Sequence, residues 1–301
     1  MHIHIYNPEN DMALANGTPG YTPPANIIAY RQARWDLPRQ WAAPGDIVWD
    51  HHTPYHMLHI PPGTDVRLAP WGWSPALAHQ LRQARFPDHL IPTPQWLSLL
   101  RSQSSRTATV PIQHQLGHPA HVCHTIEQVR RHLAANPHHT YILKSPWSSS
   151  GKGITHTTHP HWPQWTRHIL ERQGAVILEP RLDRIQDFAM EFQLTPGHTA
   201  SYVGLSIFTT DPYGHYLRNT HAHASEAEKT RYLTQFTAPH TSPNLQEIQD
   251  WYLTHLPHIA PWYQGPVGID MLITRDGEIC PCIEINWRMT MGMATLLQDF
   301  S

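Results

Sequence analysis

Lysine is nearly absent from this chain. Only three lysines occur among 301 residues, against eighteen arginines, and Lys144 and Lys152 stand eight positions apart in one segment. An ammonium group is a compact point charge, whereas a guanidinium group is a planar fork. In a chain that otherwise uses arginine, these two lysines indicate a role that arginine cannot fill, such as a contact between phosphate oxygens.

Charge of either sign is scarce as well, at 15% of residues with a net charge of −2. This balance argues against binding to nucleic acid or to an anionic membrane surface. No run of eighteen apolar residues occurs, and the first residues lack the basic and apolar regions of a secretory signal. Three cysteines, an odd number, do not indicate a disulfide framework. We therefore expect a cytoplasmic protein that neither binds nucleic acid nor enters a membrane.

Histidine is abundant, with 26 residues, but its spacing does not indicate a metal site. No two histidines one helical turn apart are joined by an acidic partner as in a zinc hydrolase. Cys280 and Cys282 could bind a metal only with further ligands, so we interpret them as packed strand residues. The histidines are best explained as replacements for lysine.

The first hundred residues alternate between strand, loop and helix patterns, which predicts a small Rossmann-like α/β unit over residues 1–106. Ser74 is a plausible helix N-cap, because Pro75 follows at the first helical position. The predicted strands are 1–6, 46–49 and 66–69, and the predicted helices are 76–85 and 95–103.

Residues 107–301 are predicted to form a second, α+β unit, divided near residue 180 into two subdomains. The expected strands are 120–124, 141–145, 175–179, 188–195, 200–209, 215–218, 267–274 and 278–286. The expected helices are 125–135, 163–173, 226–236 and 244–256. The last two strands are joined by Arg275-Asp-Gly277, a strong hairpin signal. Pro281 should confine its strand to a sheet edge or a bulge.

The segment from Ser148 to Gly153 contains three serines, Gly151, Lys152 and Gly153. Such small residues let backbone amides approach and cradle a phosphate group. Taken alone, the segment fits equally well a hairpin turn that happens to hold a lysine.

The final hairpin brings oxygen-bearing side chains together. Glu284 and Asn286 are two apart on one strand and so share a face, and Asp270 lies on the partner strand. Mg²⁺ prefers a few carboxylate or carbonyl oxygens and completes its shell with water and phosphate. Arg288 follows two residues later, where it could stabilise charge on a transferring phosphoryl group. Each residue alone could be an exposed strand residue, but the four together favour a metal site.

These segments resemble the ATP-grasp superfamily over about residues 107–301. The resemblance rests on Lys144-(x)₇-Lys152, Ile177-Leu-Glu-Pro-Arg-Leu182, Gly268-Ile-Asp270 and Ile283-Glu-Ile-Asn-Trp-Arg288. It implies ATP and Mg²⁺ as cofactors. The implied nucleotide contacts are Lys144, Gly151, Lys152, Gly153, Glu179 and Leu182, with Asp187 or Glu191 at the ribose. The implied metal ligands are Asp270, Glu284 and Asn286, and the implied catalytic residues are Arg288 and Arg218.

The activity that this resemblance implies is a carboxylate–amine or carboxylate–thiol ligase that forms an acyl phosphate and releases ADP and phosphate. A small-molecule kinase and a nucleotide-binding module without turnover are the alternatives. The substrates would be small molecules or peptides that carry the carboxylate and the amine. The sequence does not determine the oligomeric state, and a homodimer is one of the alternatives.

Two features depart from the family pattern. Trp287 stands where the family usually has a small residue or proline, and no lysine precedes Lys144, which leaves Arg106 as the candidate for a further basic residue. We expect the N-terminal unit to bind the acceptor, through Glu9, Asn10 and Asp11 or through the aromatic stretch 70–73.

Overall fold

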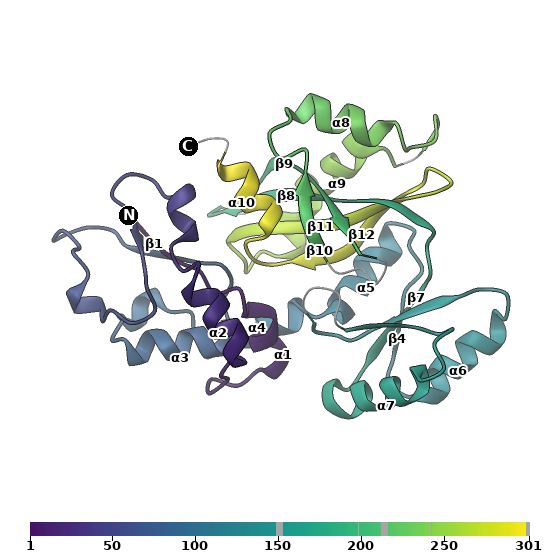
Figure 1. Ribbon diagram of the computed structural model, residues 1–301, viewed down its shortest axis with the longest axis horizontal. Helices are drawn as coiled ribbons and strands as arrows, with labels where there is room; N and C mark the ends of the chain where they lie inside the picture. The colour runs from purple at the N-terminus through teal and green to yellow at the C-terminus, as the bar shows by residue number, and fades with distance from the viewer. Residues whose placement is uncertain (149–152, 198, 212–215, 242, 299–301) are drawn as a thin grey trace.

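The computed structural model describes residues 1–148, 153–197, 199–211, 216–241 and 243–298. Within these residues the chain forms three β-sheets, which follow one another in the sequence (Figure 1). The N-terminal segment lies on one side, the five-stranded sheet lies above, and the four-stranded sheet lies at the lower right of Figure 1. In this part of the chain no helix is long and apolar enough to cross a membrane.

The N-terminal sheet is parallel and has β1 (His2–Ile5) at its centre, between β2 (Ile47–Val48) and β3 (Arg67–Pro70). Its helices are α1 (Asn10–Asn16), α2 (Ala25–Gln32), α3 (Pro75–Gln83) and α4 (Pro94–Gln103). Short 3₁₀ turns occupy Leu37–Gln40, Tyr55–Met57 and Asp88–Leu90. The Ser74 hydroxyl accepts a hydrogen bond from the Leu77 amide, so the predicted N-cap of α3 is confirmed.

The four-stranded sheet is antiparallel, in the order β4 (His121–Cys123), β7 (Val176–Pro180), β5 (Tyr141–Lys144) and β6 (Ile154–His156). Helices α6 (Ile126–Ala135) and α7 (Trp162–Gln173) pack against it over a core that includes Leu143 and Leu178. The α6 helix begins with a capping box at Thr125, and α7 ends where Gly174 takes a φ of 78°.

The five-stranded sheet is antiparallel throughout. Its order is β10 (Tyr216–Thr220), β9 (Thr199–Thr210), β8 (Arg184–Thr195), β11 (Gly265–Thr274) and β12 (Ile279–Asn286). Helices α8 (Glu226–Thr234), α9 (Leu245–Ile259) and α10 (Met291–Gln298) are among the helices that contact it.

Side-chain alternation divides this sheet into two chemically different faces. On β8, Phe188 and Met190 enter the hydrophobic core beneath α9, whereas Asp187, Ala189 and Glu191 line a cavity on the opposite face. The same alternation places Ile269 of β11 in the core and the adjacent Asp270 in the cavity. The apolar face therefore holds the sheet in place and leaves the other face for polar groups.

The final hairpin follows the prediction closely. Gly277 takes a φ of 81° in the turn, a conformation that favours glycine. The β12 strand is at the edge of its sheet, and its register with β11 shifts between the pairs Asp270–Glu284 and Leu272–Cys280. Pro281 lies within this irregular stretch, so the expected edge position and bulge are both confirmed. Cys280 and Cys282 are buried and unbridged, which agrees with packed thiols.

Helix α5 (Arg106–Gln115) is the main element that the sequence patterns did not predict. It begins after Ser105, whose hydroxyl accepts a hydrogen bond from the Thr107 amide, and it contains Pro111. A proline and several β-branched residues lower helix propensity, which hides the pattern. The helix contacts β12, β4 and β7, and so joins the two antiparallel sheets.

Candidate functional site

A cavity of about 1010 Å³ lies where the three sheets meet. Residues of the four-stranded sheet, of the polar face of the five-stranded sheet and of the N-terminal unit all line it. Sites for small molecules usually occupy such concave places between structural units, with a few converging polar groups. The polar groups of this cavity include most of the residues that the sequence singled out.

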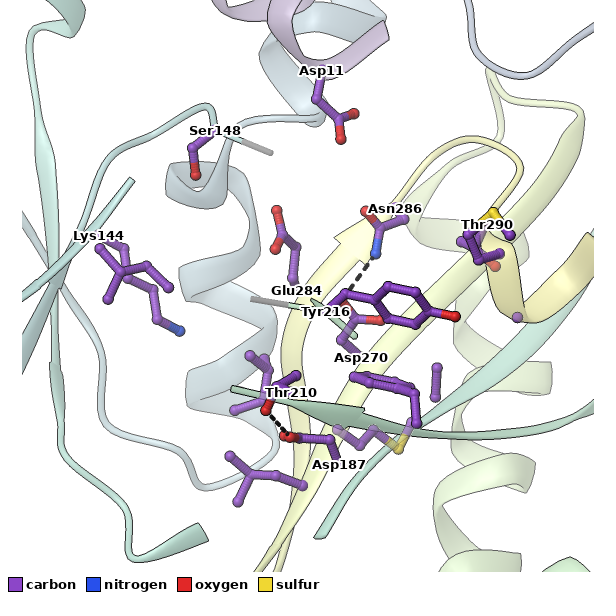
Figure 2. A pocket seen from close by; sticks show the side chains of 18 of the residues that line it. Asp11, Lys144, Ser148, Asp187, Thr210, Tyr216, Asp270, Glu284, Asn286 and Thr290 are labelled. Carbon is purple, nitrogen blue, oxygen red and sulfur yellow. Dashed lines mark hydrogen bonds between the residues drawn. The ribbon is translucent and has the colours of Figure 1, made fainter. Parts of the chain in front are cut away.

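Two carboxylates and one amide meet at the centre of the cavity (Figure 2). Asp270 and Glu284 are directly paired across β11 and β12, and the Asn286 amide donates to Asp270 Oδ2 at 3.3 Å. Burial first, and then the neighbouring Glu284 carboxylate, raise the pKa of Asp270 to about 7. Two adjacent carboxylates repel each other, so a cation placed between them would stabilise the ionised pair. The predicted convergence of these three side chains is confirmed.

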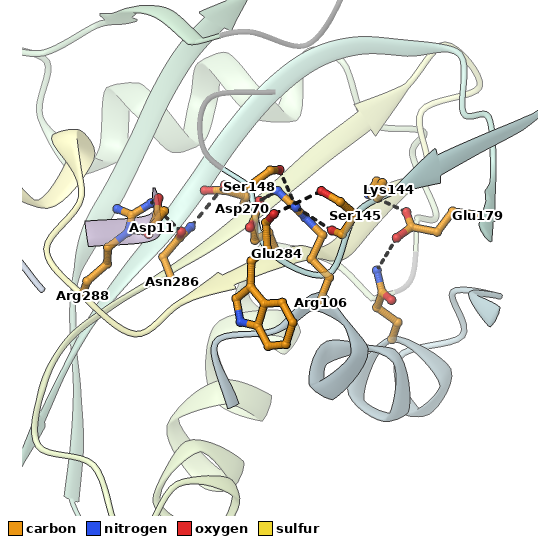
Figure 3. A network of polar contacts seen from close by, with 12 residues as sticks. Asp11, Arg106, Lys144, Ser145, Ser148, Glu179, Asp270, Glu284, Asn286 and Arg288 are labelled. Carbon is orange, nitrogen blue, oxygen red and sulfur yellow. Dashed lines mark hydrogen bonds and ion pairs between the residues drawn. The ribbon is translucent and has the colours of Figure 1, made fainter. Parts of the chain in front are cut away.

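Arg106 approaches the same carboxylates from the start of α5 (Figure 3). Its guanidinium donates to Glu284 Oε2 at 2.8 Å, to the Ser145 carbonyl at 3.0 Å and to Ser148 Oγ at 2.7 Å. It therefore ties the end of β5 to β12. Arg106 begins a helix and does not lie on the first strand of the four-stranded sheet, but it lines the cavity as a basic residue.

Lys144 and Glu179 form a buried ion pair on the four-stranded sheet. Lys144 Nζ donates to Glu179 Oε2 at 2.6 Å, and both side chains line the cavity wall. Although burial opposes ionisation, the positive charge of Lys144 lowers the pKa of Glu179 to about 2. The ammonium group is thus held at a fixed point by a carboxylate that stays charged.

A second row of side chains supports Glu179 from behind. His118 Nε2 lies 3.6 Å from Glu179 Oε2, beyond hydrogen-bond length but close enough for an ionic attraction. His118 Nδ1 lies 3.4 Å from Cys280 Sγ. Burial opposes the charge on this imidazole, but contacts with Cys280 and Glu179 raise the pKa of His118 to about 9. Gln113 of α5 also donates to Glu179 Oε1, at 3.4 Å. Sequence patterns gave no indication of His118 or Gln113.

Leu182 and Asp187 lie further along the same wall. Asp187 Oδ2 accepts a hydrogen bond from Thr210 at 2.6 Å and lies 3.3 Å from Arg184 (Figure 2). Burial raises the pKa of Asp187. Its other carboxylate oxygen has no hydrogen bond with another described residue.

Glu191 does not lie beside the Asp187 cluster, although both line the cavity. It is 1% exposed and accepts a hydrogen bond from Thr290 at 2.7 Å, and Gly268 and Gly292 leave room for its carboxyl group. A Cβ atom at Gly292 would collide with Glu191 Oε1 and with Ser206. Burial raises the pKa of Glu191 to about 8, and Oε2 has no hydrogen-bond partner within the described residues. Glu191 thus lies in the cavity beside Thr290, just before α10, whereas Asp187 lies beside Thr210.

Arg288 is held in place by residues of both the sheet and the N-terminal unit. Its guanidinium donates two hydrogen bonds to Asp11, at 2.7 and 2.8 Å, and one to Asn286 Oδ1 at 2.9 Å (Figure 3). Arg288 therefore lies on the face predicted for it, next to the Asp270–Glu284 pair. Glu9, Asn10 and Asp11 were expected to contact an acceptor substrate, and of these three Asp11 lines the cavity.

The other two residues of that motif have structural contacts. Glu9 is buried and pairs with Arg31 of α2. Asn10 is buried against Gly72, and its amide in the alternative orientation donates to the carbonyls of Gly72 and Trp73. Asn7 also binds Gly72, through its carbonyl and its amide. These contacts fix the turn that presents Asp11.

The structure does not bring Arg218 to the cavity. Arg218 is exposed on the edge strand β10, whereas Tyr216 and Asn219 of the same strand line the cavity. The register between β10 and β9 shifts between Tyr216 and Arg218, which changes the face that each residue occupies. Gly151 and Lys152 lie outside the described residues. Gly153 is buried, its carbonyl accepts from the Ser145 amide at 2.8 Å, and a Cβ there would collide with Ser145 and Ser148.

Histidine, cysteine, aspartate and glutamate do not gather in groups of three that could hold a metal ion within the described residues. The group of Asp270, Glu284 and Asn286 is not of this kind, because its third member is an amide.

Comparison with known proteins identifies the fold. No family model and no curated sequence matches the chain. Among solved structures, a D-cycloserine synthetase is similar with a TM-score of 0.55 and 13% identity, over 99% of this chain and 98% of that one. An N5-carboxyaminoimidazole synthetase from Staphylococcus aureus, complexed with ADP, gives 0.52 and 12%, over 97% and 71%. A biotin carboxylase from Campylobacter jejuni gives 0.52 and 12%, over 77% of this chain and 53% of that one. This chain has the ATP-grasp fold.

Proposed function

Because the chain has the ATP-grasp fold, we propose that it is an ADP-forming ligase that uses ATP and Mg²⁺ to join a carboxylate to an amine. One observation carries the proposal. One cavity is lined by a fixed ammonium group, a pair of adjacent carboxylates and a guanidinium held in place. These groups belong to Lys144, to Asp270 and Glu284, and to Arg288. These are the charges that a phosphoryl transfer from a nucleotide requires. The ADP and MgADP in solved structures of the same fold support the choice of nucleotide.

The nucleotide would lie between the four-stranded sheet and β8. We assign Glu179 and Leu182 to the adenine, Asp187 to the ribose and Lys144 to the phosphates. Asp187 suits a sugar hydroxyl because one of its carboxylate oxygens is held by Thr210 and Arg184. Gly151, Lys152 and Gly153 would cover the phosphates from the loop after β5, a role that rests on their sequence alone.

The metal ligands would be Asp270, Glu284 and Asn286. These three side chains fit the ion, since they offer the oxygen atoms that Mg²⁺ prefers and since Asp270 and Glu284 repel each other without a cation. When bound, Mg²⁺ supplies positive charge that neutralises the phosphate oxygens. Arg106 holds one oxygen of Glu284 and so fixes the direction of the other.

The proposed reaction has two steps. The substrate carboxylate attacks the γ-phosphorus of ATP, the bond to the bridging oxygen breaks, and ADP leaves with that electron pair. The amine then attacks the acyl carbon of the acyl phosphate, loses a proton, and expels phosphate. Arg288 would stabilise the negative charge that develops in both steps, because Asp11 and Asn286 hold its guanidinium beside the carboxylate pair. We leave the exposed Arg218 out of this catalytic set.

The test is ADP release from Mg²⁺-ATP with a panel of amino acids and short peptides, with free phosphate measured in parallel. A ligase releases ADP and phosphate in equal amounts, and only when carboxylate and amine are both present. ADP without free phosphate would identify a kinase. ATP binding without ADP release for any substrate in the panel would contradict the ligase and support a module without turnover.

A further inference from the structure

The side of the cavity formed by the N-terminal unit is strongly apolar. Within residues 1–71, all of which the structure describes, the only charged residue that lines the cavity is Asp11, which is already paired with Arg288. The remaining lining residues of residues 1–71 are Tyr6, Pro8, Met12, Ile27, Tyr30 and Trp71. The nucleotide side, by contrast, presents Lys144, Glu179 and Asp187. The cavity therefore has a polar end and an apolar end.

Aromatic rings line this apolar end from two directions. Tyr6 and Trp71 meet edge to face with their centroids 5.3 Å apart, and Tyr216 of β10 lies 5.8 Å from Phe208. Tyr30 of α2 lines the same cavity as Tyr216. The N-terminal unit and the five-stranded sheet thus face each other through aromatic side chains, and Tyr216 lies over the cavity in Figure 2.

Several of these side chains are exposed despite their size. Tyr30 is 43% exposed, Tyr216 is 37% and Met291 is 39%, and all three line the cavity. Large apolar side chains grouped around a concave surface mark a place where another apolar group binds. The cavity, at about 1010 Å³, is at the upper end of the size usual for one drug-sized ligand, so it can hold a second molecule beside a nucleotide.

We propose that this apolar end, which we call the aromatic subsite (Tyr6, Ile27, Tyr30, Trp71, Tyr216 and Met291), receives a bulky apolar or aromatic side chain of one ligase substrate. The substrate class is then an amino acid or short peptide with such a side chain. The inference rests on the proposed function for the reaction, but the binding of the side chain does not require turnover.

Polar substrates fit this surface less well. A sugar or an acidic side chain would lose its water here and find few partners, because the subsite offers tyrosine hydroxyls and one indole but no unpaired charge among its described residues. An aromatic ring, in contrast, gains from burial and from edge-to-face contacts with the rings present.

The first experiment compares matched substrates with the wild-type protein. ADP release is measured with glycine and with both enantiomers of alanine, leucine, phenylalanine, serine, asparagine and glutamate, singly and paired with alanine. We expect leucine and phenylalanine to give the highest kcat/KM, at least about tenfold above alanine, the discrimination that a hydrophobic pocket provides. A preference for serine, asparagine or glutamate would overturn the proposal.

Variants then locate the preference. Tyr30→Ala and Tyr216→Ala should lower the ratio of kcat/KM for phenylalanine over alanine by about tenfold, with the KM for ATP little changed. Tyr30→Phe keeps the ring and should keep the ratio. Leu217→Ala is the matched control, since Leu217 adjoins Tyr216 and is 60% exposed but does not line the cavity. An unchanged ratio in both alanine variants would overturn the assignment.

A binding measurement separates this proposal from the ligase proposal. The same amino acids are titrated into the protein with Mg²⁺ and a non-hydrolysable ATP analogue. Binding of phenylalanine without ADP release would support the aromatic subsite and contradict the ligase. ADP release with polar substrates only would do the reverse. If no apolar amino acid either binds or supports turnover, the aromatic subsite is wrong.

Discussion

Arg288 and Asp11 form a two-point ion pair although 277 residues separate them in the sequence. Asp11 belongs to the turn and helix that follow the first strand, and Arg288 follows the last strand of the five-stranded sheet. The pair therefore links the N-terminal unit directly to the proposed metal ligands, because Arg288 also donates to Asn286. A change in the N-terminal unit can therefore reach the reaction through this contact.

Asp11→Ala should slow ADP release by about tenfold or more while the KM for ATP changes little. The guanidinium of Arg288 loses its main partner, and a charged group is no longer held where phosphoryl charge develops. The measurement is a double-mutant cycle with Arg288→Ala, scored on kcat and on the KM for ATP. If Asp11→Ala slows the Arg288→Ala protein as much as it slows the wild type, Asp11 does not act through Arg288.

The strands and the central site could be predicted because local rules determine them. The Arg275-Asp-Gly277 turn sets the pairing of β11 with β12, so Asp270 had to lie near Glu284 and Asn286. Ile269 and Asp270 face opposite sides of the sheet because neighbouring residues of a strand alternate between its faces. Phe188 and Asp187 do so for the same reason. Fold class was likewise predicted correctly, while the division of the chain at residue 106 stays a prediction.

The contacts that the sequence did not reveal are all long-range. Arg106 meets Glu284 across 178 positions, and Gln113 meets Glu179 across 66. Both arise from α5, whose pattern is masked by Pro111. Asp11 was expected to bind a substrate group directly, but whether an acidic residue meets a substrate or another side chain depends on tertiary packing. The register shift that turns Arg218 away from the cavity also has no local signature.

Lys144→Arg should abolish most ATP turnover although the charge is conserved. The Lys144 side chain is 7% exposed and its ammonium lies 2.6 Å from Glu179, so a larger planar group cannot occupy the same place. Lys229→Arg provides the control, because Lys229 is also buried but lies on α8 and does not line the cavity. ADP release and ATP binding are measured for both. Full activity of Lys144→Arg would remove the argument that lysine is required.

Glu284→Ala should abolish Mg²⁺-dependent ADP release with the fold retained, because Glu284 is a proposed metal ligand at a strand edge. Loss of a ligand also removes the anion paired with Arg106. The matched control is Glu278→Ala, since Glu278 is exposed and immediately precedes the same strand, β12. ADP release is titrated with Mg²⁺, and circular dichroism reports the fold. Normal turnover at ordinary Mg²⁺ concentrations would contradict the metal assignment.

Glu191→Gln should stabilise the protein without nucleotide, and more so as the pH rises. Burial raises the folded-state pKa of Glu191 from an ordinary value of 4.5 to about 8, so between these pH values the native state binds the additional proton. The free energy of unfolding of the wild type therefore falls as the pH rises from about 4.5 through about 8. Each unit of pKa difference corresponds to about 1.4 kcal/mol, so the total loss is up to a few kcal/mol. Glutamine carries no such charge and escapes this loss.

The measurement is the thermal midpoint of both proteins at pH 5 and pH 8.5, without Mg²⁺ or nucleotide. At pH 5 both carry a neutral group beside Thr290, and the midpoints should nearly coincide. At pH 8.5 the variant should melt several degrees higher, since about 1 kcal/mol corresponds to roughly 2–4 °C in a chain of this size. Asp270 faces the same cavity and also has a raised pKa, but it titrates in both proteins and largely cancels in the difference. A midpoint difference that does not depend on pH would contradict this prediction. It would mean that Glu191 is charged in the folded protein at both pH values, and that another group stabilises the buried carboxylate.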